Sequence, residues 1–384
     1  MPINKLYRFL PEDKIKWDLI LNELLFPFKK ALEKTEQEKK WHGEGNVLIH
    51  TKMVCELLIQ LSEYQALEKN EKLVLFLSAL FHDVAKPVCT KIENGEIRSP
   101  NHGPTGACIT REYLWKSFNL CGNNLIEFRE GICLLIKYHT TPVHIDDNDE
   151  GIRKIIKLSL NQKLTKYFSI KNLVILSKAD ILGRISNQEK MHLDEIKTTI
   201  DLAKRIGCFD KPFEFNNSFS KIKFLNQNNV WYHDCLYDDT WGEVILMSGL
   251  PGVGKDTYIR NHFSDMKVIS LDEIRSELKV LPTDNQGPVI NEGVNRAKEL
   301  LRKKIPFIWN ATNTSALNRK KLFNIIKDYH ARVKIIYLEA PYSINIDRNN
   351  KRERVVPKNV IDRLIRQMEI PEDFEAFDVI WLSK

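Results

Sequence analysis

The sequence lacks the main features of secreted and membrane proteins. It has no run of about 18 apolar residues, and its first residues lack the basic region, apolar stretch and small-residue cleavage site of a secretory leader. The seven cysteines are odd in number and include no C-x-x-C pair, which argues against a disulfide scaffold or a structural zinc knot. We therefore expect a cytoplasmic protein without membrane segments.

The composition that is present favours folded domains. The chain has 384 residues, of which 43% are hydrophobic and 28% charged. At about 150 residues per domain, this length predicts two to three domains. The net charge of +7 is a mild basic excess, which is compatible with polyanionic partners and does not identify one.

Hydrophobic patterning divides the chain into two halves. In the first half, apolar residues recur at i, i+3, i+4 and i+7, from Val54 to Leu61 and from Leu73 to Leu80, which predicts amphipathic helices. In the second half, short apolar runs alternate with helical segments and predict a mainly parallel sheet; they cover residues 244–248, 267–270, 306–310, 333–338 and 379–382. The expected fold is multidomain: an all-α domain over 1–206, a linker over 207–241 and an α/β domain over 242–384.

A glycine-rich segment lies between the first predicted strand and a helix. Lys255 ends a G-x-x-x-x-G-K pattern whose glycines are Gly249, Gly252 and Gly254. This context predicts a P-loop for ATP, in which backbone N–H groups surround the phosphates and the lysine reaches the β and γ oxygens. Asp256 follows where Ser or Thr is usual, and Thr257 comes next, so the sequence leaves open which of them holds Mg²⁺.

Charged residues near the expected phosphate site have candidate roles. Asp272 and Arg275 follow the second predicted strand, where a carboxylate can accept a proton from an attacking hydroxyl and an arginine can bind a phosphate. A helix N-cap is the alternative for Asp272. Arg348 and Arg352 are four residues apart, so on a helix they share a face and can close over the γ-phosphate. A solvated basic surface is the alternative for this pair.

Over residues 242–384 these motifs resemble the 5′-OH polynucleotide kinases of phage and bacterial end healing. The resemblance implies Asp272 as the general base for the 5′-hydroxyl and Arg275 on the acceptor phosphate. It also implies Arg348 and Arg352 on the donor phosphates. Related small-molecule kinases share the architecture, so the acceptor remains open.

Histidines and aspartates in the first half have the order of metal ligands. His82 and Asp83 end one apolar helix, His50 lies on the preceding helix, and Asp180 lies on a later one. Imidazole and carboxylate groups suit a divalent transition metal, Mg²⁺ or Mn²⁺, which can polarise a phosphoryl oxygen and acidify water. A single histidine on an apolar helix is more often a core residue, but four ordered matches favour a metal site.

This arrangement resembles the HD phosphohydrolase superfamily over residues 40–205. The segments ALFHDVAKP, IRSPNHGPTGA, KYHTTP and KADILGR look like the HD domain fused to some tRNA nucleotidyltransferases. The resemblance implies a set of metal ligands, namely His50, His82, Asp83 and Asp180. It also implies Lys86 as a phosphate contact, with His102 and His139 as second-metal or substrate ligands or, alternatively, loop histidines. Five other histidines match no motif and are expected to be structural: His144, His192, His233, His262 and His330.

Taken together, the two halves resemble the bacterial bifunctional HD-kinase enzymes of RNA repair. This implies phosphorylation of 5′-OH ends of RNA, or of DNA, with ATP and Mg²⁺, and removal of 2′,3′-cyclic, 2′- or 3′-phosphates by the HD domain. A separate RNA ligase would then join the ends, because no ligase motif is present. Two alternatives remain: a nucleotide or small-molecule kinase fused to an HD nucleotide phosphohydrolase, and an ATP-switched regulatory or nucleic-acid-binding protein.

Overall fold

The computed structural model describes residues 2–122, 125–281, 284–352 and 355–383, which form two compact units. The first unit ends at Phe213, and the second begins at Glu214 and also includes Cys121 and Gly122. Within the described ranges, no helix combines the length and the apolar character that a membrane span requires.

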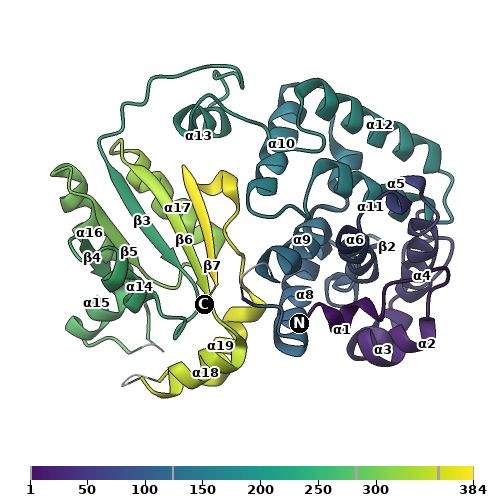
Figure 1. Ribbon diagram of the computed structural model, residues 1–384, viewed down its shortest axis with the longest axis horizontal. Helices are drawn as coiled ribbons and strands as arrows, with labels where there is room; N and C mark the ends of the chain where they lie inside the picture. The colour runs from purple at the N-terminus through teal and green to yellow at the C-terminus, as the bar shows by residue number, and fades with distance from the viewer. Residues whose placement is uncertain (1, 123–124, 282–283, 353–354, 384) are drawn as a thin grey trace. The chain divides into compact units, whose positions relative to one another are not determined.

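The first unit is almost entirely helical (Figure 1). Its longer helices are α3 (Phe26–Lys34), α4 (Val47–Leu58), α6 (Lys69–Phe81), α8 (His102–Phe118), α9 (Leu125–Tyr138), α10 (Asp149–Ser159), α11 (Ile170–Leu182) and α12 (Glu189–Ile206). Its short elements are α1 (Asn4–Tyr7), α2 (Trp17–Leu19), the π-helix η1 (Ile20–Leu24), α5 (Ser62–Gln65), α7 (Lys86–Cys89), the hairpin strands β1 (Lys91–Glu93) and β2 (Glu96–Arg98), and the 3₁₀ helices η2 (Thr141–His144) and η3 (Leu160–Lys163). The helical half that the sequence predicts is confirmed.

Helices α4 and α11 approach each other closely where the predicted ligands lie. Asn46 caps α4, because its side chain accepts a hydrogen bond from the Ile49 N–H at 3.0 Å. At the other contact, a Cβ on Gly183 would lie 2.7 Å from the Val54 side chain and 2.9 Å from its backbone. Only glycine permits this approach at the end of α11, and the approach brings His50 of α4 to Asp180 of α11.

A buried ion cluster joins α8 to α9. Arg111 donates to both carboxylate oxygens of Glu130, at 2.7 to 3.0 Å, and Arg129 donates to Oε1 at 2.7 Å. All three side chains are buried. Burial by itself would raise the pKa of Glu130, but the two guanidinium groups lower it. The carboxylate is therefore a charge on which both buried arginines depend.

The second unit is an α/β structure with one parallel sheet in the order β4-β5-β3-β6-β7 (Figure 1). The strands are β3 (Glu243–Ser248), β4 (Lys267–Ser270), β5 (Phe307–Asn310), β6 (Arg332–Glu339) and β7 (Asp378–Ser383). The helices are α13 (Ser218–Asn226), α14 (Lys255–His262), α15 (Leu271–Glu277), α16 (Gly287–Arg302), α17 (Ala316–Lys327), α18 (Tyr342–Asn350) and α19 (Lys358–Arg366), with the 3₁₀ helix η4 (Asp373–Glu375). The expected alternation of strands and helices is confirmed, and the central strand β3 leads into the P-loop.

The segment that the sequence suggests as a linker is partly folded. Helix α13 is capped by Asn217, whose side chain accepts a hydrogen bond from the Ser220 N–H at 2.7 Å. The ammonium of Lys221 is buried and lies 3.1 Å from the carboxylate of Asp373 in the same unit. Buried positions run around this nine-residue helix instead of along one face, so it shows no helical period in the sequence. From Glu214 onward, the segment belongs to the second compact unit.

Candidate functional sites

The P-loop places glycines where other residues would clash or be strained. Gly249, Gly252 and Gly254 all have positive φ, of 143°, 83° and 98°. A Cβ on Gly249 would lie 2.4 Å from the carbonyl oxygen of Leu338, and the Gly249 N–H donates to the Thr312 carbonyl at 2.8 Å. Strand β6 and the segment that follows β5 therefore fix the start of the loop, and α14 begins at its end, as phosphate binding requires.

Lys255 points back into this loop. Its ammonium donates to the carbonyl oxygens of Gly249 and Leu250 at 3.0 and 2.9 Å. Burial lowers the pKa of Lys255 to about 8, and the nearby carboxylates of Asp256 and Asp272 only partly oppose this effect. The cation thus lies inside the backbone ring that is expected to surround phosphates.

The two candidate Mg²⁺ ligands lie on the first turn of α14, and both residues are exposed. Oδ1 of Asp256 accepts a hydrogen bond from the side chain of Asn310 at 2.6 Å. Asn310 ends β5, so this contact directs the carboxylate toward the carboxyl edge of the sheet. Thr257 follows on the same turn.

Asp272 lies at the same edge, in the first turn of α15. The N-cap of this helix is Ser270, whose hydroxyl accepts from the Glu273 N–H at 3.3 Å, so the alternative role of Asp272 as N-cap is wrong. Arg275 donates to Oδ1 of Asp272 at 2.5 Å, and Arg352 lies 3.4 Å from Oδ2. Partial desolvation would raise the pKa of Asp272, whose side chain is 64% exposed, but these arginines lower it, so the carboxylate is ionised and able to accept a proton.

The two expected lid arginines come from different parts of the backbone. Arg348 lies on α18, but this helix ends at Asn350, and Arg352 lies beyond it. Their four-residue spacing therefore does not place them on one face of a continuous helix. Both nevertheless reach the P-loop site, because Arg348 donates to the Val253 carbonyl at 3.4 Å and Arg352 contacts Asp272.

In the first unit, the four H…HD…D residues converge. His50 Nε2 lies 3.0 Å from Asp180 Oδ1, 3.3 Å from His82 Nε2 and 3.6 Å from Asp83 Oδ2. His82 Nε2 lies 3.2 Å from Asp83 Oδ2. All four side chains are buried. Ligand atoms of His50, His82 and Asp83 all lie within 4.8 Å of one another, close enough to share a cation, and Asp180 lies next to them through His50.

His102 and His139 form a second group around the other oxygen of the same aspartate. Their Nε2 atoms lie 3.4 and 3.9 Å from Asp83 Oδ1, and 3.2 Å from each other. Among the described residues, this buried oxygen has no hydrogen-bond partner. Asp83 thus faces one set of histidine nitrogens with each oxygen, an arrangement that fits two neighbouring divalent ions. Both histidines lie at helix ends, at the start of α8 and just after α9.

Backbone carbonyls orient the histidine rings. The Nδ1 atoms of His82, His102 and His139 each lie 2.8 Å from the carbonyl oxygen three residues earlier. A ring that donates from Nδ1 presents the lone pair of Nε2 to the centre. Burial lowers the pKa of His139 to about 3 and also lowers that of His102, so both are neutral and able to bind a metal.

The carboxylates of this cluster are ionised. Burial alone would raise the pKa of Asp83 and of Asp180, but neighbouring cations and hydrogen bonds hold both well below the ordinary value. Arg184 contacts both oxygens of Asp180, with Nε 3.2 Å from Oδ1. Lys86 is buried, and its ammonium lies 2.7 Å from Asp83 Oδ2 and 2.6 Å from the side-chain oxygen of Gln37.

Glu44 is a further part of this cluster that the sequence patterns do not reveal. Its side chain is 1% exposed, and Oε1 lies 2.8 Å from His42 Nδ1 and 3.0 Å from His50 Nδ1. Its other oxygen accepts from the Ile185 N–H at 2.9 Å. Burial would raise the pKa of Glu44, but these hydrogen bonds lower it far below its usual range. No motif includes this residue, and only the folded structure brings the Ile185 N–H to its second oxygen.

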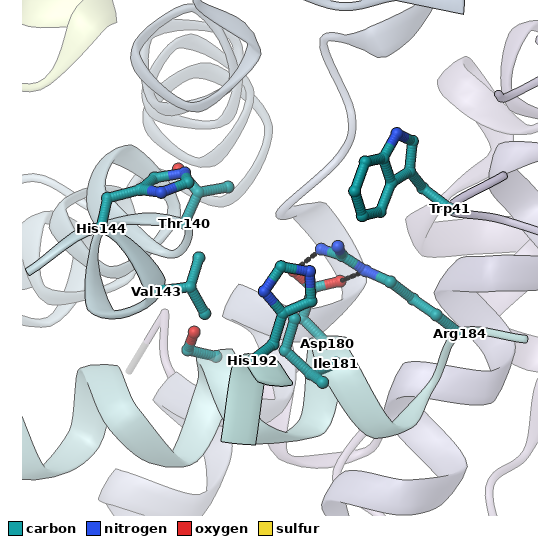
Figure 2. Close-up of a pocket in the computed structure, with 9 residues that line it drawn as sticks. Trp41, Thr140, Val143, His144, Asp180, Ile181, Arg184 and His192 are labelled. Carbon is teal, nitrogen blue, oxygen red and sulfur yellow. Dashed lines mark hydrogen bonds and ion pairs between the residues drawn. The ribbon is translucent and has the colours of Figure 1, made fainter. Parts of the chain in front are cut away.

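A cavity of about 220 Å³ lies beside Asp180 and Arg184 (Figure 2). Trp41, His144 and His192 line it, together with Thr140 and Val143. From the sequence alone, His144 and His192 are expected to be structural, and Trp41 belongs to no motif. Their only signal is their position in the folded chain.

Comparison with known proteins agrees with this division. Residues 244–371 match the family model described as an AAA domain. The second unit has the P-loop kinase fold. The chain is 27% identical over 143 residues to an L-seryl-tRNA(Sec) kinase of Methanococcus maripaludis. This alignment covers 35% of this chain and 56% of that protein.

Two other similarities are partial. The chain is 30% identical over 171 residues to a Multifunctional CCA protein of Psychromonas ingrahamii, covering 44% of this chain and 37% of that protein. It thus spans about half of the first relative and little more than a third of the second. A solved tunicamycin resistance protein of Deinococcus radiodurans aligns at 21% identity and a TM-score of 0.26, over 33% of this chain and 79% of that one. The sequence relatives and the family match are consistent with a P-loop kinase-type domain fused to a second functional domain; the HD assignment and the site residues remain predictions.

Proposed function

We propose that this protein heals nucleic-acid ends, principally those of RNA. The P-loop unit transfers the γ-phosphoryl group of ATP to a 5′-hydroxyl, and the helical unit hydrolyses 2′,3′-cyclic, 2′- or 3′-phosphates. One observation carries the proposal: the same chain has an ionised carboxylate beside a P-loop and a buried His and Asp cluster suited to metal-assisted hydrolysis. A relative named as a kinase of L-seryl-tRNA supports an acceptor carried on RNA.

In the kinase site, the residues divide between donor and acceptor. The glycine N–H groups and Lys255 bind the β and γ phosphates of ATP, and Arg348 stabilises charge on them. Asp272 accepts the proton of the 5′-hydroxyl. The hydroxyl oxygen then bonds to the γ phosphorus, and the bond from the γ phosphorus to the β-phosphate oxygen breaks to release ADP. Mg²⁺ held by Asp256 or Thr257 would neutralise charge on the phosphates.

In this site, Arg275 and Arg352 both contact Asp272 in the structure. When substrates bind, Arg275 is available for the acceptor phosphate and Arg352 for the donor. Once Arg275 and Arg352 move to the substrates, they lower the pKa of Asp272 less, and its carboxylate becomes a better base.

In the HD site, a divalent ion held by His50, His82, Asp83 and Asp180, with a second beside His102 and His139, would polarise the phosphoryl oxygens and acidify water. Residues of the protein orient the histidine rings and supply positive charge at this site. Backbone carbonyls hold the Nδ1 protons, so the Nε2 atoms face inward. The Arg184 guanidinium and the Lys86 ammonium place positive charge where an anionic phosphate would enter.

A kinase assay tests the first activity. We expect labelled phosphate to pass from γ-labelled ATP to a short 5′-OH RNA, and we expect Lys255→Ala and Asp272→Ala each to abolish transfer. Asp265→Ala, at an exposed aspartate in the turn after α14, is the control and should remain active. Transfer to free nucleosides or serine but not to RNA would contradict a polynucleotide acceptor.

A phosphatase assay tests the second activity. RNA with a 2′,3′-cyclic phosphate end should be hydrolysed when Mn²⁺ or another divalent metal is added. His82→Ala and Asp83→Ala should abolish this reaction and leave ATP binding intact, whereas His233→Ala, at an exposed histidine of the second unit, should have no effect. Hydrolysis that survives both cluster substitutions would disprove the assigned site.

A further inference from the structure

The cavity beside the metal cluster has one flat aromatic wall. Trp41 stands on the side of Arg184, and Thr140, Val143 and His144 stand on the opposite side, with His192 between them (Figure 2). These residues come from the loop before α4, from the η2 region, from the end of α11 and from α12. Asp180 lines the same cavity, so a molecule bound there lies next to the metal cluster.

The side chains around the cavity suit a nucleotide. Trp41 offers an indole surface on which a planar ring can stack, with the His192 ring centroid 6.0 Å away. The Lys40 ammonium lies over the indole ring, 4.9 Å from its centroid. The Arg184 guanidinium lines the cavity and binds Asp180 through Nε and one terminal nitrogen. Aromatic stacking next to positive charge is the usual way in which proteins hold unpaired bases.

We infer that this cavity binds the base of the terminal nucleotide whose phosphate the HD site hydrolyses, with Trp41 as the stacking surface; the inference rests on the proposed function of that site. At about 220 Å³, the cavity is smaller than the pockets of about 300–1,000 Å³ that hold drug-sized ligands, so it takes one base and not a stacked pair. The sugar then spans from the cavity to the metal cluster, and the phosphate lies by Arg184 and Asp180.

Substrates with and without a base test this assignment. The two substrates are cytidine 2′,3′-cyclic phosphate and the 2,3-cyclic phosphate of 1-O-methylribose, which keeps the sugar and the phosphate. Trp41→Ala should raise KM for the cytidine substrate on the order of tenfold, leave kcat nearly unchanged, and not alter KM for the base-free substrate. Trp41→Phe should restore most of the affinity. Trp231→Ala, at an exposed tryptophan of the second unit, is the matched control.

A binding measurement separates this proposal from the activity. Calorimetry of metal-free protein with cytidine 3′-monophosphate should show weaker binding in Trp41→Ala by a similar factor, and unchanged binding in Trp231→Ala. If wild-type protein hydrolyses neither substrate, the proposed activity fails, and the calorimetric comparison alone decides the cavity. If both substrates are hydrolysed and Trp41→Ala changes neither KM, or changes both equally, the base site is refuted and the phosphohydrolase stands.

Discussion

Replacement of Glu44 by glutamine should weaken metal binding by the His and Asp cluster. Glu44 contacts no predicted metal position, but its carboxylate lies 3.0 Å from Nδ1 of His50. The negative charge stabilises a proton on Nδ1 and makes Nε2 a stronger donor to a cation. In Glu44→Gln the shape stays the same, but the charge is lost, and His50 keeps the Gly183 carbonyl at 3.2 Å as its Nδ1 partner.

The expected size of the effect follows from this contact. A hydrogen bond to a charged group contributes about 1.5–3 kcal/mol, and loss of such an outer-shell partner typically lowers metal affinity by about 10–100-fold. Because the contact is buried, with the Glu44 side chain 1% exposed, screening by solvent is small. We therefore expect the Kd for Mn²⁺ to rise by at least about tenfold.

Titration of metal-free protein with Mn²⁺, by calorimetry or against a fluorescent chelator, measures this change. His42→Ala is the matched control, because it removes the other histidine that contacts Glu44 and leaves the His50 contact in place. This control should lower the free energy of unfolding yet change the Kd by less than about threefold. If folded Glu44→Gln binds Mn²⁺ as tightly as wild-type protein, the orienting role is refuted.

Three other predictions follow from particular contacts. Gly249→Ala should reduce the affinity for ATP by at least about tenfold, because the added Cβ would lie 2.4 Å from a carbonyl oxygen. Gly207→Ala is the control, because Gly207 also has positive φ but its Cβ would have no atom within 4 Å. If equilibrium titrations show equal losses of ATP affinity in both variants, the steric argument is wrong. The pKa of Lys255 is about 8, and bound phosphates would raise it. ATP binding should therefore be accompanied by the uptake of about half a proton at pH 8 and about 0.1 proton at pH 7. The affinity for ATP should fall above pH 8, where the lysine of the free protein is mostly neutral. Calorimetry in buffers of different ionisation heat detects this uptake, which should vanish in Lys255→Arg. Glu130→Gln should lower the free energy of unfolding by about 3–5 kcal/mol, because it removes a buried carboxylate that pairs with two buried guanidinium groups. A change below about 1 kcal/mol in urea denaturation would disprove this account.

The sequence determined the fold class because local patterns carry it. Apolar residues at helical spacing around Leu73 to Leu80 appear as α6, and the five short apolar runs appear as the strands of the parallel sheet. The P-loop could also be predicted from the sequence, because its glycines, its lysine, the preceding strand and the following helix are contiguous. The linker was the prediction with the least support in the sequence, because helix α13 lies within it and is short and buried around most of its surface.

Only the tertiary structure decided how distant side chains combine. The sequence named His50 and Asp180 as candidates, but Gly183 at the contact between α4 and α11 is what brings them within 3.0 Å. Glu44 and Trp41 belong to no sequence motif: Glu44 lies close in sequence to His50 but is also held by the Ile185 N–H, and Trp41 meets His192 only after packing. A contiguous motif encodes its own geometry in the backbone, whereas a site built from separate helices depends on how those helices pack.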